Sequence, residues 1–272
     1  MSKRIISGIT GAIFAFVVLL FSHNYPFIIS ITTAIISIIA MNEIFSVMNL
    51  SKNYPLVFFT LIFISVLPLI GNYLAWQIAL YAYTLIIFCL LITNPSLSLQ
   101  DAAVTYTMAI IITFGFGSLT ELRILGINYG SFYVFLALAI AWISDTGAYF
   151  FGKFLGKNKL CPNVSPKKTI EGFIGGVITC VSCLVIIAYV FNSLVFSQRH
   201  TINYFLIVIL ALFGSAISTL GDLCFSVIKR KYRVKDFGNL MPGHGGILDR
   251  FDSVIFVAPY VLIFLKFINI IH

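Results

Sequence analysis

The chain has 272 residues, of which 60% are hydrophobic and only 10% are charged, and it carries a formal net charge of +8. This composition excludes an ordinary soluble domain and indicates a helical protein that crosses the membrane several times. The apolar stretches are continuous rather than alternating, which excludes a transmembrane β-barrel. We expect the positive charge to reflect membrane topology and anionic headgroups, with no nucleic acid as a partner.

Polar residues, proline and glycine divide the chain into nine apolar stretches, each close to the roughly 20 residues that a membrane-spanning helix needs. They cover residues 5–22, 27–47, 55–71, 73–93, 102–119, 132–151, 170–192, 203–228 and 252–270. We therefore predict an all-α, polytopic integral membrane protein with about nine transmembrane helices, the first of them uncleaved. Residues 1–130 would form about five N-terminal spans, and residues 131–272 the C-terminal transmembrane catalytic region.

The basic residues predict the orientation in the membrane. With a cytoplasmic N-terminus and nine spans, fourteen Lys and Arg residues lie inside and two, Arg123 and Arg199, lie outside. Eight of the nine acidic residues also fall at or near the cytoplasmic ends of spans: Glu43, Asp101, Asp145, Glu171, Asp222, Asp236, Asp249 and Asp252. Acidic residues contribute little to topology, so their position beside basic loops indicates a shared polar site at the cytoplasmic face.

A second patch of polar residues precedes the seventh predicted span. Thr169 or Ser165 is suited to cap that helix, while Lys167 and Lys168 either mark topology or bind a triphosphate or a lipid phosphate. Gly172 and Gly176, four residues apart, permit close helix packing. Two acidic residues of earlier spans are ambiguous. Asp145, inside the sixth span, needs a basic partner or a cation, and Glu43 is either similar or an ordinary polar helix end.

The polar stripe at the end of the eighth predicted span is a stronger signal. Ser218, Asp222, Ser226 and Lys229 follow one face of a helix. An aspartate at this depth needs a partner or a watery cavity, which makes Asp222 a candidate site residue. The alternative is a purely structural pair between Asp222 and Lys229.

The segment after this stripe combines positive charge with glycine. Its basic residues are Lys229, Arg230, Lys231, Arg233, Lys235 and Arg250. Between them lies Pro242–Gly243–His244–Gly245–Gly246, whose glycines allow the backbone to approach an anion. His244 is suited to contact a phosphate or to transfer a proton, although such a turn by itself also fits a plain flexible loop.

Two further aspartates, Asp249 and Asp252, stand three residues apart at the start of the ninth predicted span and share a helix face. An aspartate in a first helical turn is ordinary. The presence of both aspartates together with Arg250 and Asp222 is better explained by a divalent cation that the carboxylates bind and that substrate phosphates also contact. We therefore predict metal ligands at Asp222, Asp249 and Asp252.

These motifs resemble, in order, those of the phosphatidate cytidylyltransferases. The resemblance covers about residues 140–260 and rests on Asp145–Thr–Gly–Ala–Tyr149, Ser165–Pro–Lys–Lys–Thr169, Gly221–Asp222, Lys235–Asp236–Phe–Gly238 and Pro242–Gly–His244 through Asp249–Arg250–Phe–Asp252–Ser253. It implies that CTP and phosphatidate form CDP-diacylglycerol and diphosphate with Mg²⁺, and it leaves a second cation open. It also implies a bacterial inner-membrane protein whose active site faces the cytoplasm; a homodimer is left open.

The resemblance also implies roles for the candidate residues. Asp222, Asp249 and Asp252 would hold the cation. Asp145 would belong to the substrate-binding site. The remaining candidates would bind the triphosphate, the lipid phosphate or the leaving diphosphate: Lys167, Lys168, Ser226, Lys229, Arg230, Lys235, His244, Gly245, Gly246 and Arg250.

Two other functions fit parts of the sequence. A CTP-dependent kinase of a polyprenol or another lipid alcohol would share the nucleotide and the metal, but it would need a general base. A transporter of anionic solutes would place charges near the bilayer midplane, whereas here they gather at one face. Alcohol transfer from CDP-diacylglycerol is disfavoured because the Asp–Gly–x–x–Ala–Arg pattern is absent.

Overall fold

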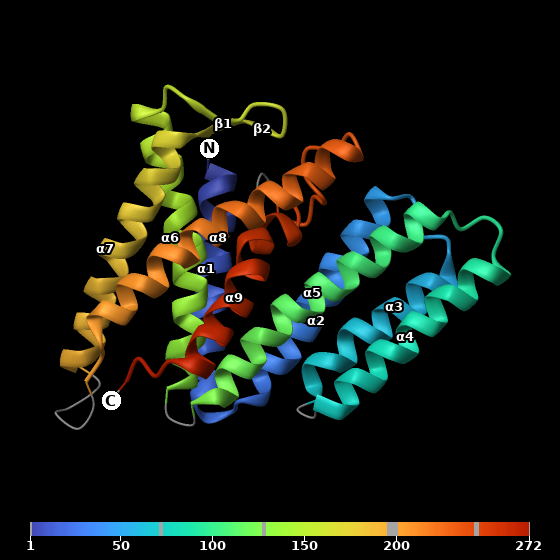
Figure 1. Cartoon of the computed structure of the whole chain (residues 1–272), viewed down its shortest axis with the longest axis horizontal. Coiled ribbons are helices and arrows are strands. Elements are labelled where there is room, and N and C mark those ends of the chain that lie inside the picture. Colours follow the sequence, from blue (N-terminus) through green and yellow to red (C-terminus); the bar gives the residue numbers. More distant parts are fainter. Residues whose placement is uncertain (1, 71–72, 127–128, 195–200, 242–244, 272) are drawn as a thin grey trace. The chain divides into compact units, whose positions relative to one another are not determined.

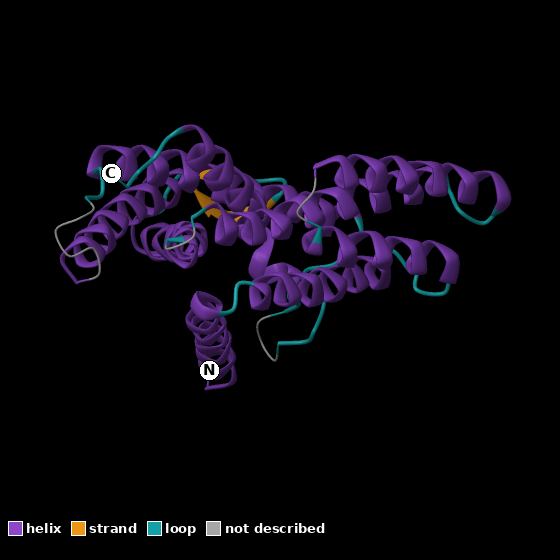
Figure 2. Ribbon diagram, turned by 90° about the horizontal axis from the view of Figure 1, so that it is seen from below, coloured by secondary structure: helices purple, strands orange, loops and turns teal. Residues whose placement is uncertain are grey.

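The computed structural model describes residues 2–70, 73–126, 129–194, 201–241 and 245–271, and this backbone is almost entirely helical (Figures 1 and 2). The α-helices are α1 (Ser2–Asn24), α2 (Phe27–Val47), α3 (Tyr54–Val66), α4 (Tyr73–Thr93), α5 (Leu99–Leu125), α6 (Gly130–Leu155), α7 (Ile170–Leu194), α8 (Tyr204–Lys231) and α9 (Leu248–Phe267). A 3-10 turn, η1 (Leu67–Leu69), follows α3. The predicted all-α membrane class is confirmed.

Length and hydropathy identify six described helices that could cross a membrane: α2, α4, α5, α6, α7 and α8. The protein is therefore a multi-pass membrane protein, and the number of nine spans stays a prediction. Some boundaries differ from those expected. Helix α8 continues to Lys231, and α9 begins at Leu248, so Lys229, Arg230 and Asp249 are helical residues.

Side-chain caps explain where two of the helices begin. Ser98 Oγ accepts a hydrogen bond of 3.0 Å from the backbone N–H of Asp101 at the start of α5. Thr169 Oγ1 accepts one of 3.1 Å from the N–H of Gly172 at the start of α7. Each hydroxyl satisfies a backbone donor that has no partner within the first helical turn.

A small strand pair, which the sequence analysis did not predict, connects α6 with α7. Strands β1 (Lys159–Cys161) and β2 (Ser165–Thr169) are antiparallel, with Lys159 opposite Thr169 and Cys161 opposite Ser165. Its two short strands have too many polar residues to show the alternation of apolar and polar residues that predicts a strand. The connection is also held by Glu171, whose carboxylate accepts hydrogen bonds from the backbone N–H groups of Lys157 and Asn158, at 3.0 and 3.1 Å.

The chain divides into two compact units, Met1–Ser131 with Lys231–Phe251, and Phe132–Arg230 with Asp252–His272. In the first unit, α2, α3, α4 and α5 run side by side (Figure 1). Hydroxyl groups join these helices: Thr33 Oγ1 lies 3.1 Å from Thr120 Oγ1, and Thr60 Oγ1 lies 3.1 Å from Tyr83 OH. The Tyr83 ring also stacks on Phe63, with centroids 4.2 Å apart.

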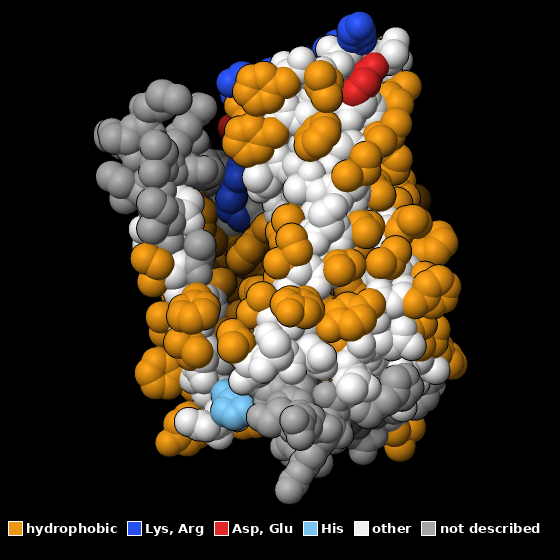
Figure 3. Space-filling view, turned by 90° about the vertical axis from the view of Figure 1, so that its left-hand side faces the viewer, with side chains coloured by type: hydrophobic (Ala, Val, Ile, Leu, Met, Phe, Trp, Pro, Cys, Tyr) orange, Lys and Arg blue, Asp and Glu red, His pale blue; other side chains and the backbone are white. Residues whose placement is uncertain are grey.

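In the second unit, glycines let α6 pack closely against α7. A Cβ on Gly176 would lie 2.8 Å from the backbone oxygen of Ser144, and one on Gly172 would lie 2.8 Å from that of Ala148. The predicted packing role of Gly172 and Gly176 is confirmed. The outer face of α7 is apolar, because Ile174, Ile178, Ile186, Tyr189 and Leu194 are exposed along the helix. Figure 3, a view from the left-hand side of Figure 1, shows many hydrophobic side chains on the surface. Such a face suits the lipid tails of a bilayer.

Candidate active site

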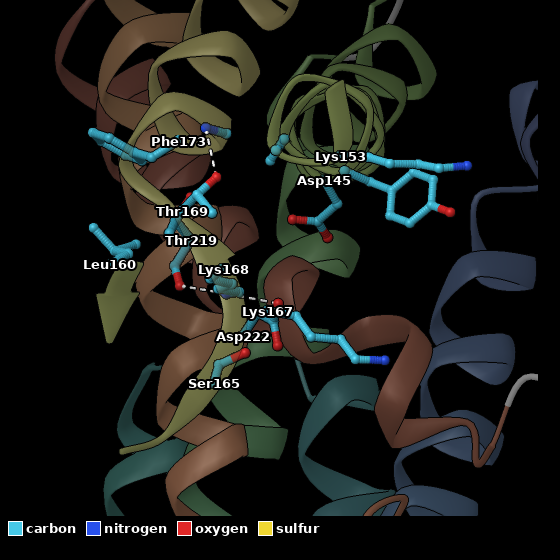
Figure 4. Close-up of a pocket in the computed structure, with 14 residues that line it drawn as sticks. Asp145, Lys153, Leu160, Ser165, Lys167, Lys168, Thr169, Phe173, Thr219 and Asp222 are labelled. Atoms are coloured by element: carbon cyan, nitrogen blue, oxygen red, sulfur yellow. Dashed lines mark hydrogen bonds and ion pairs between the residues drawn. The ribbon is translucent and has the colours of Figure 1, made fainter. Parts of the chain in front are cut away.

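A cavity of about 520 Å³ lies in the second unit, between the strand pair and helices α6, α7 and α8. Figure 4 shows the charged side chains among its lining residues: Asp145, Lys153, Lys167, Lys168 and Asp222. Three lysines and two aspartates thus share one cavity, although they come from helix α6, strand β2 and helix α8. Phe173, Leu160 and Tyr149 add apolar surface, so the cavity combines groups for an anion with groups for a hydrocarbon.

Lys168 pairs with Asp222 across this cavity. Its ammonium group lies 2.7 Å from Asp222 Oδ2, and it also donates to the backbone oxygen of Thr219 at 3.3 Å (Figure 4). The two charged side chains are 21% and 29% exposed, so water still reaches both. Strand β2 makes this pair because alternate residues of a strand face opposite sides, which directs Lys168 toward α8.

Three aspartates of the second unit lie near one another, and serine hydroxyls bind two of them. Asp145 accepts hydrogen bonds from Ser218 Oγ at 3.2 Å and from Ser253 Oγ at 2.8 Å. Asp222 accepts one from Ser226 Oγ at 3.3 Å. The carboxylates of Asp145, Asp222 and Asp252 are close enough to repel one another.

Lys168 and Lys229 partly compensate this negative charge. Lys229, which is buried, has its ammonium group 4.0 Å from Asp252 Oδ2. The stripe that the sequence analysis identified on the eighth span therefore faces Asp145 of α6 and Asp252 of α9. Carboxylates that are paired with lysines in this way are suited to exchange partners: a phosphate can replace the carboxylate at a lysine, and a divalent cation can replace the lysine at a carboxylate.

Asp249 belongs to the first unit and is held by the backbone. Its Oδ2 accepts hydrogen bonds from the N–H of Phe237 at 2.8 Å and from the N–H of Gly246 at 2.9 Å. Gly245 has a φ of +85°, and a Cβ there would lie 2.8 Å from Asp249 Oδ2. Both the backbone conformation and the lack of space therefore require glycine at position 245. The N–H of the next residue, Gly246, donates to a protein carboxylate in this structure.

The remaining predicted residues are distributed as follows. Lys167 lines the cavity and is exposed, and Arg230 is exposed with its Nε donating to the backbone oxygen of Val164 at 3.3 Å. Lys235 and Arg250, in the first unit, are exposed. His244, with Pro242 and Gly243, lies outside the described residues.

Three residues near these sites were not among the predicted site residues, although Tyr149 and Ser253 stand in the motifs that carry the family resemblance. Tyr149 and Lys153 line the cavity, and Ser253 donates to Asp145. Helical spacing could have identified the first two, because Asp145, Tyr149 and Lys153 follow at intervals of four residues on one face of α6. Ser253 comes from a helix far along the chain, and no local pattern indicates its partner.

The donor chemistry suits a hard divalent cation, for which carboxylate and hydroxyl oxygens are ordinary ligands. Within the described ranges, no group of three or more His, Cys, Asp and Glu residues is arranged to hold a metal ion.

Comparison with known proteins agrees with the chemistry of the site. The sequence model of the cytidylyltransferase family matches residues 2–268. Phosphatidate cytidylyltransferase of Bacillus subtilis (strain 168) is 34% identical over 280 residues, which covers 96% of each chain. The enzymes of the same name from Staphylococcus saprophyticus and Staphylococcus aureus (strain COL) are 39% and 44% identical, over 71% and 62% of this chain and 67% and 60% of their own.

Proposed function

The chain belongs to the cytidylyltransferase family, and we propose that it acts as a phosphatidate cytidylyltransferase, converting CTP and phosphatidate into CDP-diacylglycerol and diphosphate. The observation that carries this proposal is the likeness to the Bacillus subtilis enzyme over 96% of both chains. The cavity supports this proposal, because its lysines and its apolar wall suit a phosphorylated lipid and a nucleoside triphosphate.

In this reaction an oxygen of the lipid phosphate attacks the α-phosphorus of CTP. The new P–O bond forms as the bond from the α-phosphorus to the diphosphate breaks. The attacking phosphate is already ionised at neutral pH, so the protein need not remove a proton. What remains is to hold two anions together and to stabilise the leaving diphosphate, and this work is positioning and charge neutralisation.

We assign the anion contacts to the basic side chains. Lys167 and Lys168, which line the cavity, would bind phosphate oxygens there, and Lys168 would exchange Asp222 for phosphate. The other contacts to the triphosphate and the lipid phosphate are assigned to Lys229, Arg230, Lys235, Arg250, Ser226 and Gly245. The predicted contact of Gly246 is not proposed again, because its N–H donates to Asp249. His244 would contact the leaving diphosphate.

Cytidylyltransferases of this kind generally use a divalent cation. We propose that it is Mg²⁺ and that Asp222, Asp249 and Asp252 supply its protein ligands. When bound, the ion supplies positive charge to the phosphate oxygens. We assign Asp145 to the substrate-binding site, where it accepts hydrogen bonds from Ser218 and Ser253 and so would hold them beside Asp222 and Asp252.

The protein is a multi-pass membrane protein, and we propose that it lies in a bacterial inner membrane with its active site facing the cytoplasm. CTP is a cytoplasmic compound, whereas phosphatidate lies in the leaflet, so the site must be at the inner interface. The excess of Lys and Arg in the predicted cytoplasmic loops supports this orientation.

The deciding experiment uses two labels on CTP. Purified protein in mixed micelles with phosphatidate and Mg²⁺ should place label from [α-³²P]CTP in the lipid, and label from [γ-³²P]CTP only in diphosphate. Transfer of the γ label to an added polyprenol would show a lipid-alcohol kinase instead. Absence of label in any lipid would contradict both enzymatic functions.

A further inference from the structure

Glu43, on helix α2, is a buried carboxylate that none of the proposed reaction steps uses. Its residue is 9% exposed, and it lies near the end of an apolar helix that could cross the membrane. A carboxylate at such a position is costly unless it is fully hydrogen-bonded. Its partners should therefore show why it is there.

The partners of Glu43 are backbone groups at the start of α9. Its Oε1 accepts a hydrogen bond of 2.8 Å from the N–H of Ile247, and its Oε2 accepts one of 2.9 Å from the N–H of Leu248. Both donors belong to the helix terminus, where backbone N–H groups lack partners and the helix dipole favours a negative charge. Glu43 thus caps α9 from a helix about 200 residues earlier in the chain.

The same few residues hold Asp249. The N–H groups of Gly246, Ile247 and Leu248 are consecutive donors; the first binds Asp249 Oδ2 and the next two bind Glu43. With its Oδ2 fixed by two backbone N–H groups, Asp249 has a set direction for its other oxygen. Any shift of the α9 start would move that oxygen as well.

Two glycines make room for the Glu43 carboxylate. A Cβ on Gly246 would collide with both carboxylate oxygens, and a Cβ on Gly238 would lie 2.6 Å from Oε1 and 2.9 Å from Cδ. Gly238 and Gly246 come from different parts of the Lys231–Phe251 segment, so the segment wraps around this carboxylate. A carboxylate enclosed on two sides and bound by two donors is a built contact and not a chance approach.

We propose that Glu43 is a positioning residue for the reaction: it fixes the start of α9 and thereby the direction of Asp249. This inference rests on the proposed function for the role of Asp249, but the contact itself does not. It also gives α2 a specific task, which is to hold the backbone that precedes a proposed cation ligand.

The test compares Glu43→Gln with Asn42→Ala, the exposed neighbour on the same helix. Glutamine keeps the size of the side chain, but it loses the charge and one of the two acceptors. We expect kcat to fall about 10- to 100-fold, as for a misplaced reacting group, and the Mg²⁺ concentration for half-maximal activity to rise. Asn42→Ala should change neither. Gly238→Ala, whose methyl group would displace the carboxylate, should reproduce the Glu43→Gln effect, and the double variant should lose little more.

Hydrogen exchange of the full-length protein without substrates separates this inference from the proposed function. The amides of Ile247 and Leu248 should exchange faster in Glu43→Gln than in wild type, while the melting temperature changes by only a few degrees. Unchanged protection, or unchanged kcat and Mg²⁺ dependence in an active enzyme, would overturn the positioning role. If the wild type transfers no cytidylyl group, the proposed function fails, and the exchange result still decides whether Glu43 holds α9.

Discussion

The ammonium group of Lys168, which we assign to a substrate phosphate, lies 2.7 Å from Oδ2 of Asp222, which we assign to a cation, so the two side chains neutralise each other in this structure. Both are partly exposed, at 21% and 29%. A partly hydrated pair of this kind is readily separated, because water offsets the loss of the partner. Arrival of the triphosphate would give Lys168 a new partner and leave Asp222 free to bind a cation.

Replacing Lys168 by methionine should therefore lower kcat/KM for CTP about 10- to 100-fold, since hydrogen bonds to charged groups contribute roughly 1.5–3 kcal/mol. Steady-state rates in mixed micelles measure this effect. Lys159→Met is the matched control, because Lys159 is an exposed lysine of the same strand pair that does not line the cavity. Equal losses in the two variants would mean that general surface charge, rather than the cavity, binds the nucleotide.

Asp222→Asn should reduce turnover about 100-fold or more, because the neutral amide is a poor ligand for a cation and removes charge from the site. Membrane insertion and the melting temperature should be close to those of wild type, since asparagine keeps the shape and can still contact Ser226. The control is Glu121→Gln, an exposed acidic residue near the end of α5. Near-normal rates in Asp222→Asn would remove Asp222 from the proposed cation ligands.

Two glycine substitutions test helix packing. In Gly176→Ala the new methyl group would lie 2.8 Å from a backbone oxygen of α6, so we expect a loss of about 1–3 kcal/mol from overpacking. In Gly117→Ala, on α5, the methyl group would meet Trp76 at 3.5 Å, an ordinary contact, so the better helix propensity of alanine should leave stability equal or raised by up to about 1 kcal/mol. Melting temperatures in detergent compare them, and a more stable Gly176→Ala would contradict the packing.

Cysteine labelling tests the orientation. In a variant without the five native cysteines, Lys235→Cys should react with a membrane-impermeant maleimide only after the inner membrane is opened. Glu121→Cys should react in cells whose inner membrane is intact, because Glu121 is exposed and falls on the predicted outer side. Labelling of Lys235→Cys in such cells would reverse the proposed topology.

The sequence predicted the membrane class and the helical stripe on α8 because both depend on local properties. Hydropathy is summed over neighbouring residues, and Ser218, Asp222, Ser226 and Lys229 share a face through the pitch of one helix. The strand pair between α6 and α7 was missed, since its two strands have three and five residues. That omission also hid which lysine of the Lys167–Lys168 pair faces α8.

By itself, the sequence determined that this is a helical membrane protein, where its charged residues stand along the chain, and which family its motifs resemble. Only the tertiary structure decided which partner each charged side chain has: Lys168 pairs with Asp222, Asp145 binds Ser253, and Glu43 binds the backbone N–H groups of Ile247 and Leu248. The reason is physical. A helix or a hydropathy pattern depends on residues within one or two turns of one another. A contact across about 200 residues depends on how separate helices pack, and the residues next to it in the chain do not indicate that packing.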